Sequence, residues 1–427
     1  MVLVWLAVAQ CGSLPVTPMP VIAIVAMERG WYSICRLPAE LRAAGWTVHA
    51  LCDPGSPLGT SRHLAGIVRW DRRSTKLPGA RYRLWTLLRE VGPDWIIPGD
   101  DAAAHYLCRI RDGAIGRDDG RLRAVLRESL PPWDVLTRLD FKDEFASLCV
   151  ELGLPAISTT TCALPALEKD PVAAVPGYPA ILKLAFGAGG SSVIGVHRPD
   201  DLPLAIRALR RQVRGRRPAA SRLRWGWDIA HHPRARPPRV CVQPWIDGAH
   251  HQLVFVGFGG RLIGATVWRV LRRVTAFGPS SVVRSESRPD VVALVQRLLA
   301  ATRFSGFGQI EFIDERATAR TYLGEMNARP VAAHSLGKHV GADLAKVFTA
   351  AFAGEAPLEP VIGTGGVTIA LFPHELERDP ESTFLGQALH DVPWDDPPLL
   401  ARLGRRSGFN SPDSESADEG WPGFEKT

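Results

Sequence analysis

The sequence reads GQIEFI at residues 308–313 and EMNARP at residues 325–330, and each stretch closes an apolar run. Side chains two positions apart on a strand lie on the same face, so Glu325 and Asn327 point the same way. If the first stretch is the antiparallel neighbour of the second, Glu311 joins them. Such oxygens suit Mg²⁺, which predicts a metal site held against a nucleotide. The alternative, two solvated acids, is disfavoured because both runs look half-buried and an unpaired buried carboxylate is unfavourable.

A lysine and a glycine-rich loop precede these stretches. Residues 178–184 read YPAILKL, an apolar strand pattern that contains Lys183. A lysine there is unfavourable unless it meets an anion, and the backbone N–H groups of the next loop can bind a phosphate. Strand patterns flank the loop, which favours a hairpin flap, with an ordinary tight turn as the alternative. The candidate phosphate-binding residues of the flap are Gly187, Gly189, Gly190, Ser191 and Ser192.

A third strand pattern, VCVQPWIDG at residues 240–248, ends in an acidic turn. In their order and spacing, the lysine strand, the flap, this strand, the carboxylate strand and the Glu-x-Asn-x-Arg motif resemble the ATP-grasp superfamily. The helix opening at residues 140–142 and the GLPA turn at residues 153–156 strengthen the resemblance, which covers roughly residues 135–350 and extends more weakly upstream. The chain is most similar to the carboxylate–amine ligase branch, within it to poorly characterised bacterial ATP-grasp proteins.

The resemblance implies a role for each matching residue. Lys142 and Lys183 would bind nucleotide phosphates beneath the flap. Glu311 and Glu325 would bridge two Mg²⁺ (or Mn²⁺) ions, with Asn327 on the second ion. Adenine would stack and hydrogen-bond in a hinge that consists of Gln243, Pro244, Trp245 and Ile246.

The hinge departs from the family pattern in two places. Pro244 stands where a glutamate is common, and His250 and His251 stand where a further acid is common. Ribose recognition through that glutamate therefore does not carry over to this chain, and Asp247 is a candidate substitute.

Three residues are candidate catalytic groups. The resemblance gives Arg329 the role of steadying the transferring phosphoryl group or the substrate acid. Among Arg269, Arg272 and Arg273, one is expected to face the γ-phosphate, and Arg272 is our candidate; a basic surface stripe is the alternative. His334 follows the metal strand and is a candidate base or substrate contact, with a simply packed histidine as the alternative.

The implied activity is that of an ATP- and Mg²⁺-dependent ligase. A carboxylate attacks the γ-phosphate of ATP to give an acyl phosphate, and an amine or similar nucleophile then displaces the phosphate, forming a C–N or related bond. Both steps gather negative charge, which metal ions and fixed cations neutralise. The alternatives are a phosphotransferase and a nucleotide-binding regulatory protein without catalysis. The intact Glu311, Glu325 and Asn327 argue against the last of these.

The chain has 427 residues, more than one hydrophobic core usually serves. We expect a mixed α/β and α+β architecture, in which a Rossmann-like pre-ATP-grasp domain precedes a two-lobed ATP-grasp fold. The expected units are the pre-ATP-grasp domain at 20–125, an N-terminal subdomain with the flap at 126–245, a C-terminal subdomain with the metal site at 246–360, an extension at 361–406 and a disordered tail at 407–427.

Two acids, Asp100 and Asp101, follow the apolar run at residues 93–99. The carboxyl ends of strands in open α/β sheets face the ligand crevice, so these acids are candidates for substrate binding. Capping of the following helix is the alternative that we favour.

The formal net charge of +7 raises the alternative of nucleic-acid binding. Much of the excess lies between Arg207 and Arg239, where arginines alternate with aromatic residues. Prolines interrupt that segment and break any regular stripe, so we favour a solvated helix and loop and do not expect nucleic acid as a partner.

Seven cysteines are scattered through the chain without a Cys-x-x-Cys pair, which favours a reducing cytosol over a zinc ribbon or a disulfide framework. No apolar run is long enough to span a membrane. We therefore expect a cytoplasmic protein whose partners are a small-molecule carboxylate and a nucleophile; an oligomer is compatible with the sequence.

Overall fold

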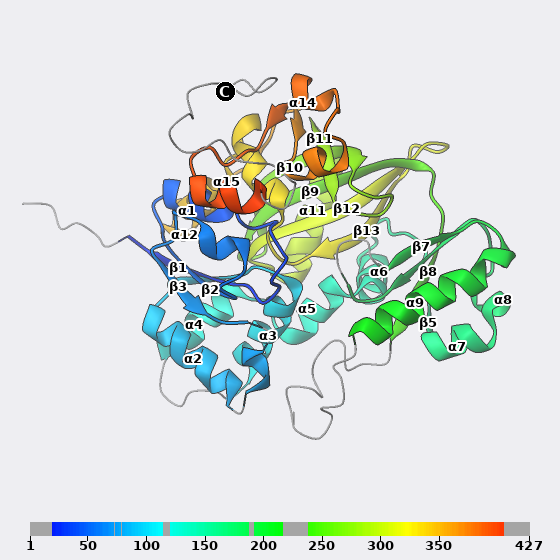
Figure 1. Cartoon of the computed structure of the whole chain (residues 1–427), viewed down its shortest axis with the longest axis horizontal. Helices are drawn as coiled ribbons and strands as arrows, with labels where there is room; N and C mark the ends of the chain where they lie inside the picture. The colour runs from blue at the N-terminus through cyan, green and yellow to red at the C-terminus, as the bar shows by residue number, and fades with distance from the viewer. Residues whose placement is uncertain are drawn as a thin grey trace, which may run out of the picture.

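The computed structural model describes residues 19–71, 73–77, 79–113, 120–187, 192–216 and 238–404 (Figure 1). The predicted flap residues Gly189, Gly190 and Ser191, the predicted tail at 407–427 and most of the arginine-rich segment lie outside the described residues. Three β-sheets organise the described chain.

The N-terminal region forms a parallel sheet in the order β3-β2-β1-β4. Its strands are β1 (Val21–Val25), β2 (Thr47–Cys52), β3 (Gly66–Arg69) and β4 (Trp95–Pro98). Ile22 and Ile24 pack on one face with Leu41 of α1, and Ala23 and Val25 on the other with the helices after β3, which explains why these strands read as continuous apolar runs. The helices of this region are α1 (Leu37–Ala43), α2 (Ala80–Val91), α3 (Asp101–Asp112) and α4 (Gly120–Ser129).

The central sheet is largely antiparallel, in the order β13-β12-β9-β10-β11-β15-β16, with β14 beside β10. Val254 and Val256 face α12 (Leu344–Phe352), whereas Leu253 and Phe255 face α11 (Pro289–Thr302), as strand alternation requires. The strands are β9 (Gly248–Phe258), β10 (Arg261–Arg273), β11 (Ser280–Glu286), β12 (Gly306–Glu315), β13 (Thr321–Asn327), β14 (Val361–Ile362), β15 (Thr368–Ala370) and β16 (Leu389–His390).

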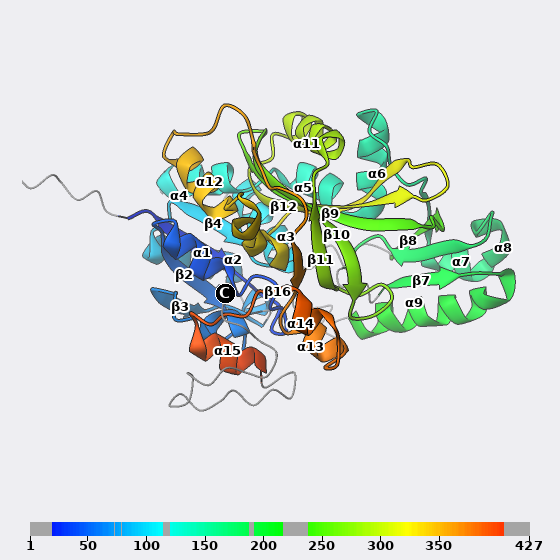
Figure 2. The same ribbon diagram turned by 90° about the horizontal axis from the view of Figure 1, so that it is seen from above.

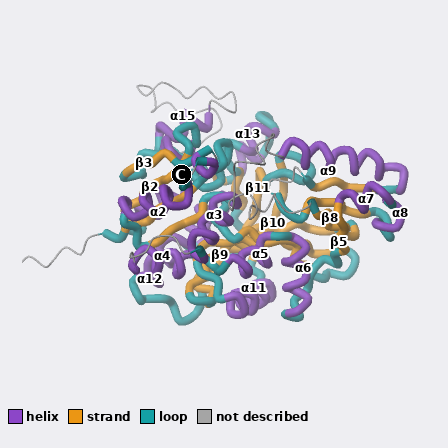
Figure 3. The backbone as a smooth tube through the Cα atoms, turned by 90° about the horizontal axis from the view of Figure 1, so that it is seen from below, coloured by secondary structure: helices purple, strands orange, loops and turns teal. Residues whose placement is uncertain are grey.

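A smaller antiparallel sheet lies to one side of the central sheet, in the order β5-β8-β6-β7 (Figure 2). It has its own core, in which Leu182 and Val242 meet Leu167 and Leu209 of the covering helices. The strands are β5 (Thr160–Ala163), β6 (Ala180–Leu184), β7 (Val193–Val196) and β8 (Arg239–Pro244), and the helices are α7 (Leu164–Lys169), α8 (Pro171–Ala174) and α9 (Leu202–Arg216). Figure 3 shows these helices along the strands of this lobe.

Short elements complete the chain. The segment after residue 360 adds β14, β15 and β16 to the central sheet, so it is integral to the fold. The remaining helices are α5 (Trp133–Asp140), α6 (Lys142–Glu151), α13 (His374–Arg378), α14 (Phe384–Gln387) and α15 (Pro397–Gly404), with 3₁₀ turns η1 (Pro57–Thr60), η2 (Ser74–Lys76), η3 (Pro199–Asp201) and η5 (Ala332–Val340). Within the described ranges, no helix has the length and apolarity needed to cross a membrane.

Candidate active site

One cavity is lined by residues that come from the segments of all three sheets, and the predicted metal residues lie in its wall. In the β12–β13 ladder, Glu311 stands directly opposite Glu325, and Gln309 stands opposite Asn327. Residues that pair across a ladder share a face, so the two carboxylates and the amide meet on one side of the sheet. The Asn327 side-chain N–H₂ donates to Gln309 Oε1 at 2.8 Å, which supports this common orientation.

Two buried lysines face this carboxylate pair. Lys142 is the first residue of α6 and is 5% exposed; its Nζ lies 3.2 Å from Glu325 Oε2 and donates to the Gly187 carbonyl at 2.8 Å. Lys183, on β6 and 7% exposed, has its Nζ 3.9 Å from the same Glu325 oxygen. Both lysines line the cavity, so the smaller sheet and α6 bring two cations to the acids of the central sheet.

The pKa values of Glu311 and Glu325 are shifted in opposite directions. Burial raises the pKa of Glu325, but the opposing lysines outweigh it and hold that pKa below its usual range. Burial and the neighbouring Glu325 charge raise the pKa of Glu311, with Arg273 opposing them. Burial lowers the pKa of Lys183, whereas the attraction of Glu325 keeps the pKa of Lys142 raised despite burial. Glu325 is thus stabilised by two lysines, whereas Glu311 faces a like charge, so a further cation between the two acids would be favourable.

The predicted hinge lines the other end of the cavity. Gln243 donates through Nε2 to Thr159 Oγ1 at 2.7 Å, and Trp245, 37% exposed, contacts the ring of Phe277 with 6.2 Å between centroids. The Trp245 backbone N–H already donates to the Pro179 carbonyl at 3.0 Å. Pro244 and Ile246 complete this wall.

Asp247, His250 and His251, which belong to the part of the hinge that departs from the family pattern, differ in whether they line the cavity. Asp247 is exposed and pairs with Arg316 at 3.1 Å, and it does not line the described cavity, so the structure gives no support for it as a ribose ligand. His250 does line the cavity, and burial lowers its pKa to about 4, which leaves the imidazole neutral at pH 7. His251 points to the opposite face of the sheet, where its ring stacks on Phe312.

Arg329 lies at the end of β13 and is almost completely buried. Asp101 accepts from its Nε and Nη2, Asn327 Oδ1 accepts from Nη2 at 3.0 Å, and the guanidinium carbon lies 4.7 Å from the centre of the Trp31 ring. Asp100 instead caps α3 by accepting the Ala103 N–H at 2.8 Å. Of the two acids after β4, one therefore takes the favoured capping role and the other orients Arg329.

Two predicted catalytic residues do not line the cavity. Arg273, next to Arg272 on β10, lies in the cavity wall, whereas the Arg272 guanidinium lies 5.2 Å from the Phe384 ring. The register of β10 against β11 shifts on both sides of Arg272, so regular alternation does not hold there. His334 is buried; its Nδ1 accepts the Val331 N–H at 2.9 Å and its Nε2 faces the Phe255 carbonyl at 3.3 Å. Burial lowers the pKa of His334 to about 4, so this histidine is a packed, neutral residue.

No protein-family profile matches the sequence. Biotin carboxylase 1 of Bacillus subtilis is 23% identical over 225 residues, which cover 51% of this chain and 46% of that protein. Acetyl-CoA carboxylase 1 of rice is 26% identical over 155 residues, 36% of this chain and 6% of that protein. The chain thus spans about half the length of the first relative and a small part of the second.

Solved structures give longer matches. The biotin carboxylase domain dimer of Hydrogenobacter thermophilus 2-oxoglutarate carboxylase, solved with MgADP, ADP and bicarbonate, has a TM-score of 0.56 at 18% identity and covers 81% of this chain and 72% of that one. An L-amino acid ligase from Bacillus licheniformis has a TM-score of 0.56 at 13% identity, covering 79% and 76%. The chain has the ATP-grasp fold. This confirms the predicted fold class.

The cavity contains residues that the sequence analysis did not single out. Gln252 on β9 accepts from Gln309, and Trp31 and Ser33 reach the cavity from the loop after β1. The sequence could have predicted Gln309 as a site residue, because it lies two positions before Glu311 and therefore shares its face. Trp31 could not be predicted in this way, since its place depends on how the N-terminal domain packs against β13.

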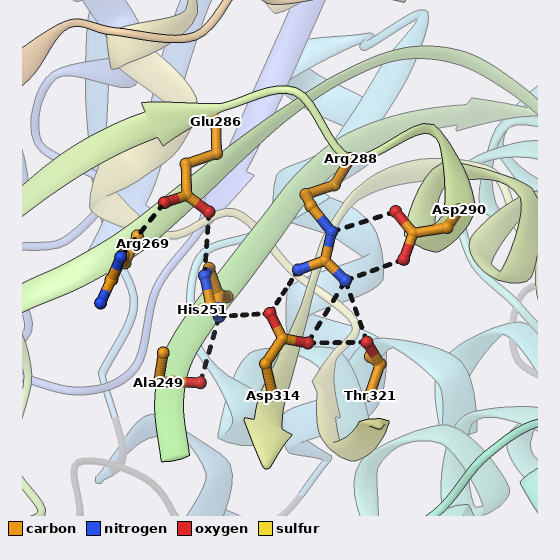
Figure 4. Close-up of polar contacts among 8 residues, drawn as sticks. All are labelled: Ala249, His251, Arg269, Glu286, Arg288, Asp290, Asp314 and Thr321. Carbon is orange, nitrogen blue, oxygen red and sulfur yellow. Dashed lines mark hydrogen bonds and ion pairs between the residues drawn. The ribbon is translucent and has the colours of Figure 1, made fainter. Parts of the chain in front are cut away.

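Figure 4 shows a second charged network around His251. Because His250 lines the cavity and neighbouring side chains on β9 alternate, this network lies on the other face of the sheet. His251 Nε2 lies 3.0 Å from Glu286 Oε2, and His251 Nδ1 lies 3.5 Å from Asp314 Oδ2. Asp314 also accepts from Arg288. The other members drawn in Figure 4 are Ala249, Arg269, Asp290 and Thr321.

Proposed function

We propose that this chain is an ATP- and Mg²⁺-dependent ligase that activates a carboxylate as an acyl phosphate and joins it to an amine or similar nucleophile. The observation that carries the proposal is the meeting of Glu311 and Glu325 with Lys142 and Lys183 in one cavity that also contains the hinge. The carboxylates can bind metal ions and the lysines can bind phosphates, so a metal-bound nucleotide matches this set.

The nucleotide would span the cavity. Its adenine would occupy the hinge between Gln243 and Ile246, and its phosphates would draw Lys142 and Lys183 from Glu325. Gly187, the first residue of the predicted flap, would lie beside the phosphates. Lys142 already contacts the Gly187 carbonyl, so one lysine connects α6 with the start of the flap.

The donor set fits Mg²⁺, or Mn²⁺ in its place. Two carboxylates stand opposite each other with an amide oxygen beside them, and the like charges of Glu311 and Glu325 favour a cation between them. Within the described residues there is no cluster of three His, Cys, Asp or Glu side chains able to hold a metal alone, so nucleotide oxygens and water would complete the coordination. The bound metal would neutralise charge on the β- and γ-phosphates.

The reaction would proceed in two displacements. A carboxylate oxygen of the substrate forms a bond to the γ-phosphorus while the bond from that phosphorus to the β–γ bridging oxygen breaks, and ADP leaves. A nucleophile nitrogen then forms a bond to the carbonyl carbon, phosphate leaves, and a proton passes to water. Lys142, Lys183 and Arg329 would hold the phosphoryl oxygens and the acid in line, which is the main contribution of a protein to this chemistry.

The comparisons support the same assignment. A protein solved with MgADP and bicarbonate and a protein named as an L-amino acid ligase share this fold. We further propose small-molecule substrates and a cytoplasmic location, which agrees with the described cysteines being free. The fold neighbour from Hydrogenobacter thermophilus is a dimer, so a dimer is the first oligomer to test.

The test is an ADP-release assay with Mg²⁺, ATP and a panel of carboxylic acids, in which hydroxylamine traps acyl phosphate as a hydroxamate. We expect acid-dependent ADP release with equal hydroxamate formation. A stable phosphorylated acceptor without hydroxamate would assign the chain as a phosphotransferase instead. Absence of Mg²⁺-dependent nucleotide binding by calorimetry would overturn both assignments.

A further inference from the structure

The cavity wall beyond Arg329 differs in chemistry from the phosphate end. Trp31 lies against the Arg329 guanidinium there, with 4.7 Å between the ring centre and the guanidinium carbon. The residues that line this wall are Trp31, Ser33, Val331, Ala332, Ala333, Leu371 and His374. Most of its surface is therefore aromatic or aliphatic carbon.

The acids of the cavity lie away from this wall. Among the described lining residues, the carboxylates are Glu311 and Glu325, and Glu325 faces the lysines. Asp101 lies behind Arg329 and uses both of its oxygens on that guanidinium. An ammonium group bound at the apolar wall would have no carboxylate to pair with, and burying it there would be unfavourable.

A donor for one carboxylate does exist at this wall. Arg329 Nη1 has only a long 3.4 Å contact with the Pro330 carbonyl, whereas Nε and Nη2 are taken by Asp101 and Asn327. The Trp31 indole Nε1 is buried and has no hydrogen-bond partner in the described structure. Because the Trp31 nitrogen does not face open cavity space, Arg329 Nη1 is the donor left for an oxygen of a bound acid.

We propose that the acid substrate is an apolar monocarboxylic acid without an ammonium group, whose hydrocarbon part packs on Trp31, Val331 and Leu371. The inference rests on the proposed ligase function and names its substrate class. The carboxylate end points toward Arg329 and the phosphate site, because the oxygen that attacks the γ-phosphorus must lie there. Apolar contact with the indole ring and the two aliphatic side chains then selects the remainder of the acid.

The test compares matched acids on the full chain with Mg²⁺, ATP and hydroxylamine. 3-Phenylpropanoate is the probe, phenylalanine adds only an α-ammonium group, and glutarate replaces the ring with a second carboxylate. We expect kcat/KM for hydroxamate formation to be at least about tenfold higher with 3-phenylpropanoate than with either comparison acid. A higher value with phenylalanine or glutarate would overturn the substrate class and leave the ligase function intact. ADP release without hydroxamate from any acid would overturn the ligase function and the inference with it.

Variants locate the contact. Trp31→Ala should raise the KM for 3-phenylpropanoate at least about tenfold, with the KM for ATP within about twofold, and Trp31→Phe should recover most of the loss because it restores the ring. Trp394→Ala, which removes a half-exposed tryptophan outside this cavity, is the matched control. An equal rise in both KM values for Trp31→Ala, unrelieved by Trp31→Phe, would show a general structural effect and contradict the proposed contact.

Discussion

Each face of the central sheet carries a cluster of charged side chains, and the two clusters differ in how completely their members are paired. On the cavity face, Lys142 and Lys183 share the single carboxylate of Glu325, and Glu311 stands beside it with a raised pKa. On the far face, His251 has an acid at each ring nitrogen, and Arg288 is held by Asp290 and Asp314 (Figure 4). The strands and their spacing are the same, so the difference lies in how completely each group is paired.

That difference separates a binding site from a structural network. The far-face groups have partners within the protein, with Arg288 held by Asp290 and Asp314 and His251 Nε2 beside Glu286, so they should contribute chiefly to stability. The cavity-face groups are buried and unequally paired, and perturbed ionisable groups that line a cavity are candidates for ligand binding. Substitutions on the two faces should therefore act on different observables.

The largest effect should come from Glu325→Gln. The amide keeps the shape of the side chain but removes the charge that would hold a metal ion and oppose the lysines. We expect Mg²⁺-dependent ADP release to fall at least about a hundredfold. Glu286→Gln on the far face is the matched control and should retain activity within about twofold. Equal losses in the two variants would erase the distinction between the faces.

The next effect is the pH dependence of stability that His334 causes. Like the far-face groups, His334 has its partners within the protein. His334 is satisfied by backbone groups, and its pKa in the folded chain is lowered to about 4. The unfolded imidazole titrates near 6.5, so the unfolded chain takes up the proton first as the pH falls, and the folded state loses about 3 kcal/mol between about pH 6.5 and 4.

Chemical denaturation across that pH range, with wild-type protein and His334→Gln, measures the contribution of His334. The variant should have a flatter dependence of unfolding free energy on pH, although His250 retains its own part. Parallel curves for the two proteins would contradict a buried neutral His334.

Lys183→Met removes one of the two cations on the cavity face. Removal of one phosphate-binding cation should weaken ATP binding about tenfold or more, measured by calorimetric titration. Burial already lowers the pKa of Lys183, so the apolar substitute should leave the unfolding free energy without nucleotide unchanged or higher. Unaltered ATP affinity, or marked destabilisation of the free protein, would mean that Lys183 serves the fold.

The smallest effect should come from the Glu286→Gln control itself. Loss of the charged partner of His251 should lower the unfolding free energy by about 1 kcal/mol. Thermal unfolding of this variant beside the wild type measures it. A larger effect on ADP release than on stability would place the far-face network in the function.

Local patterns in the sequence predicted many of the strands and part of the candidate site. Strand alternation placed Glu311, Glu325 and Asn327 on one face, and an apolar strand interrupted by Lys183 indicated a buried cation; the ladder and the cavity agree with both placements. The same reasoning failed for Arg272, because a basic run on a strand does not say which of two neighbours faces inward. His334 was ambiguous because its partners are backbone groups that no pattern records.

The resemblance carried by the order of the motifs predicted the fold, and period-two spacing by itself placed Glu325 and Asn327 on one face, because that spacing depends only on near neighbours in sequence. The pairing of Arg329 with Asp101, the contact of Lys142 with Glu325 and the contact of Trp31 with the Arg329 guanidinium came from tertiary packing alone. These contacts join residues far apart along the chain, and their geometry depends on how whole domains fill space, which no local periodicity encodes.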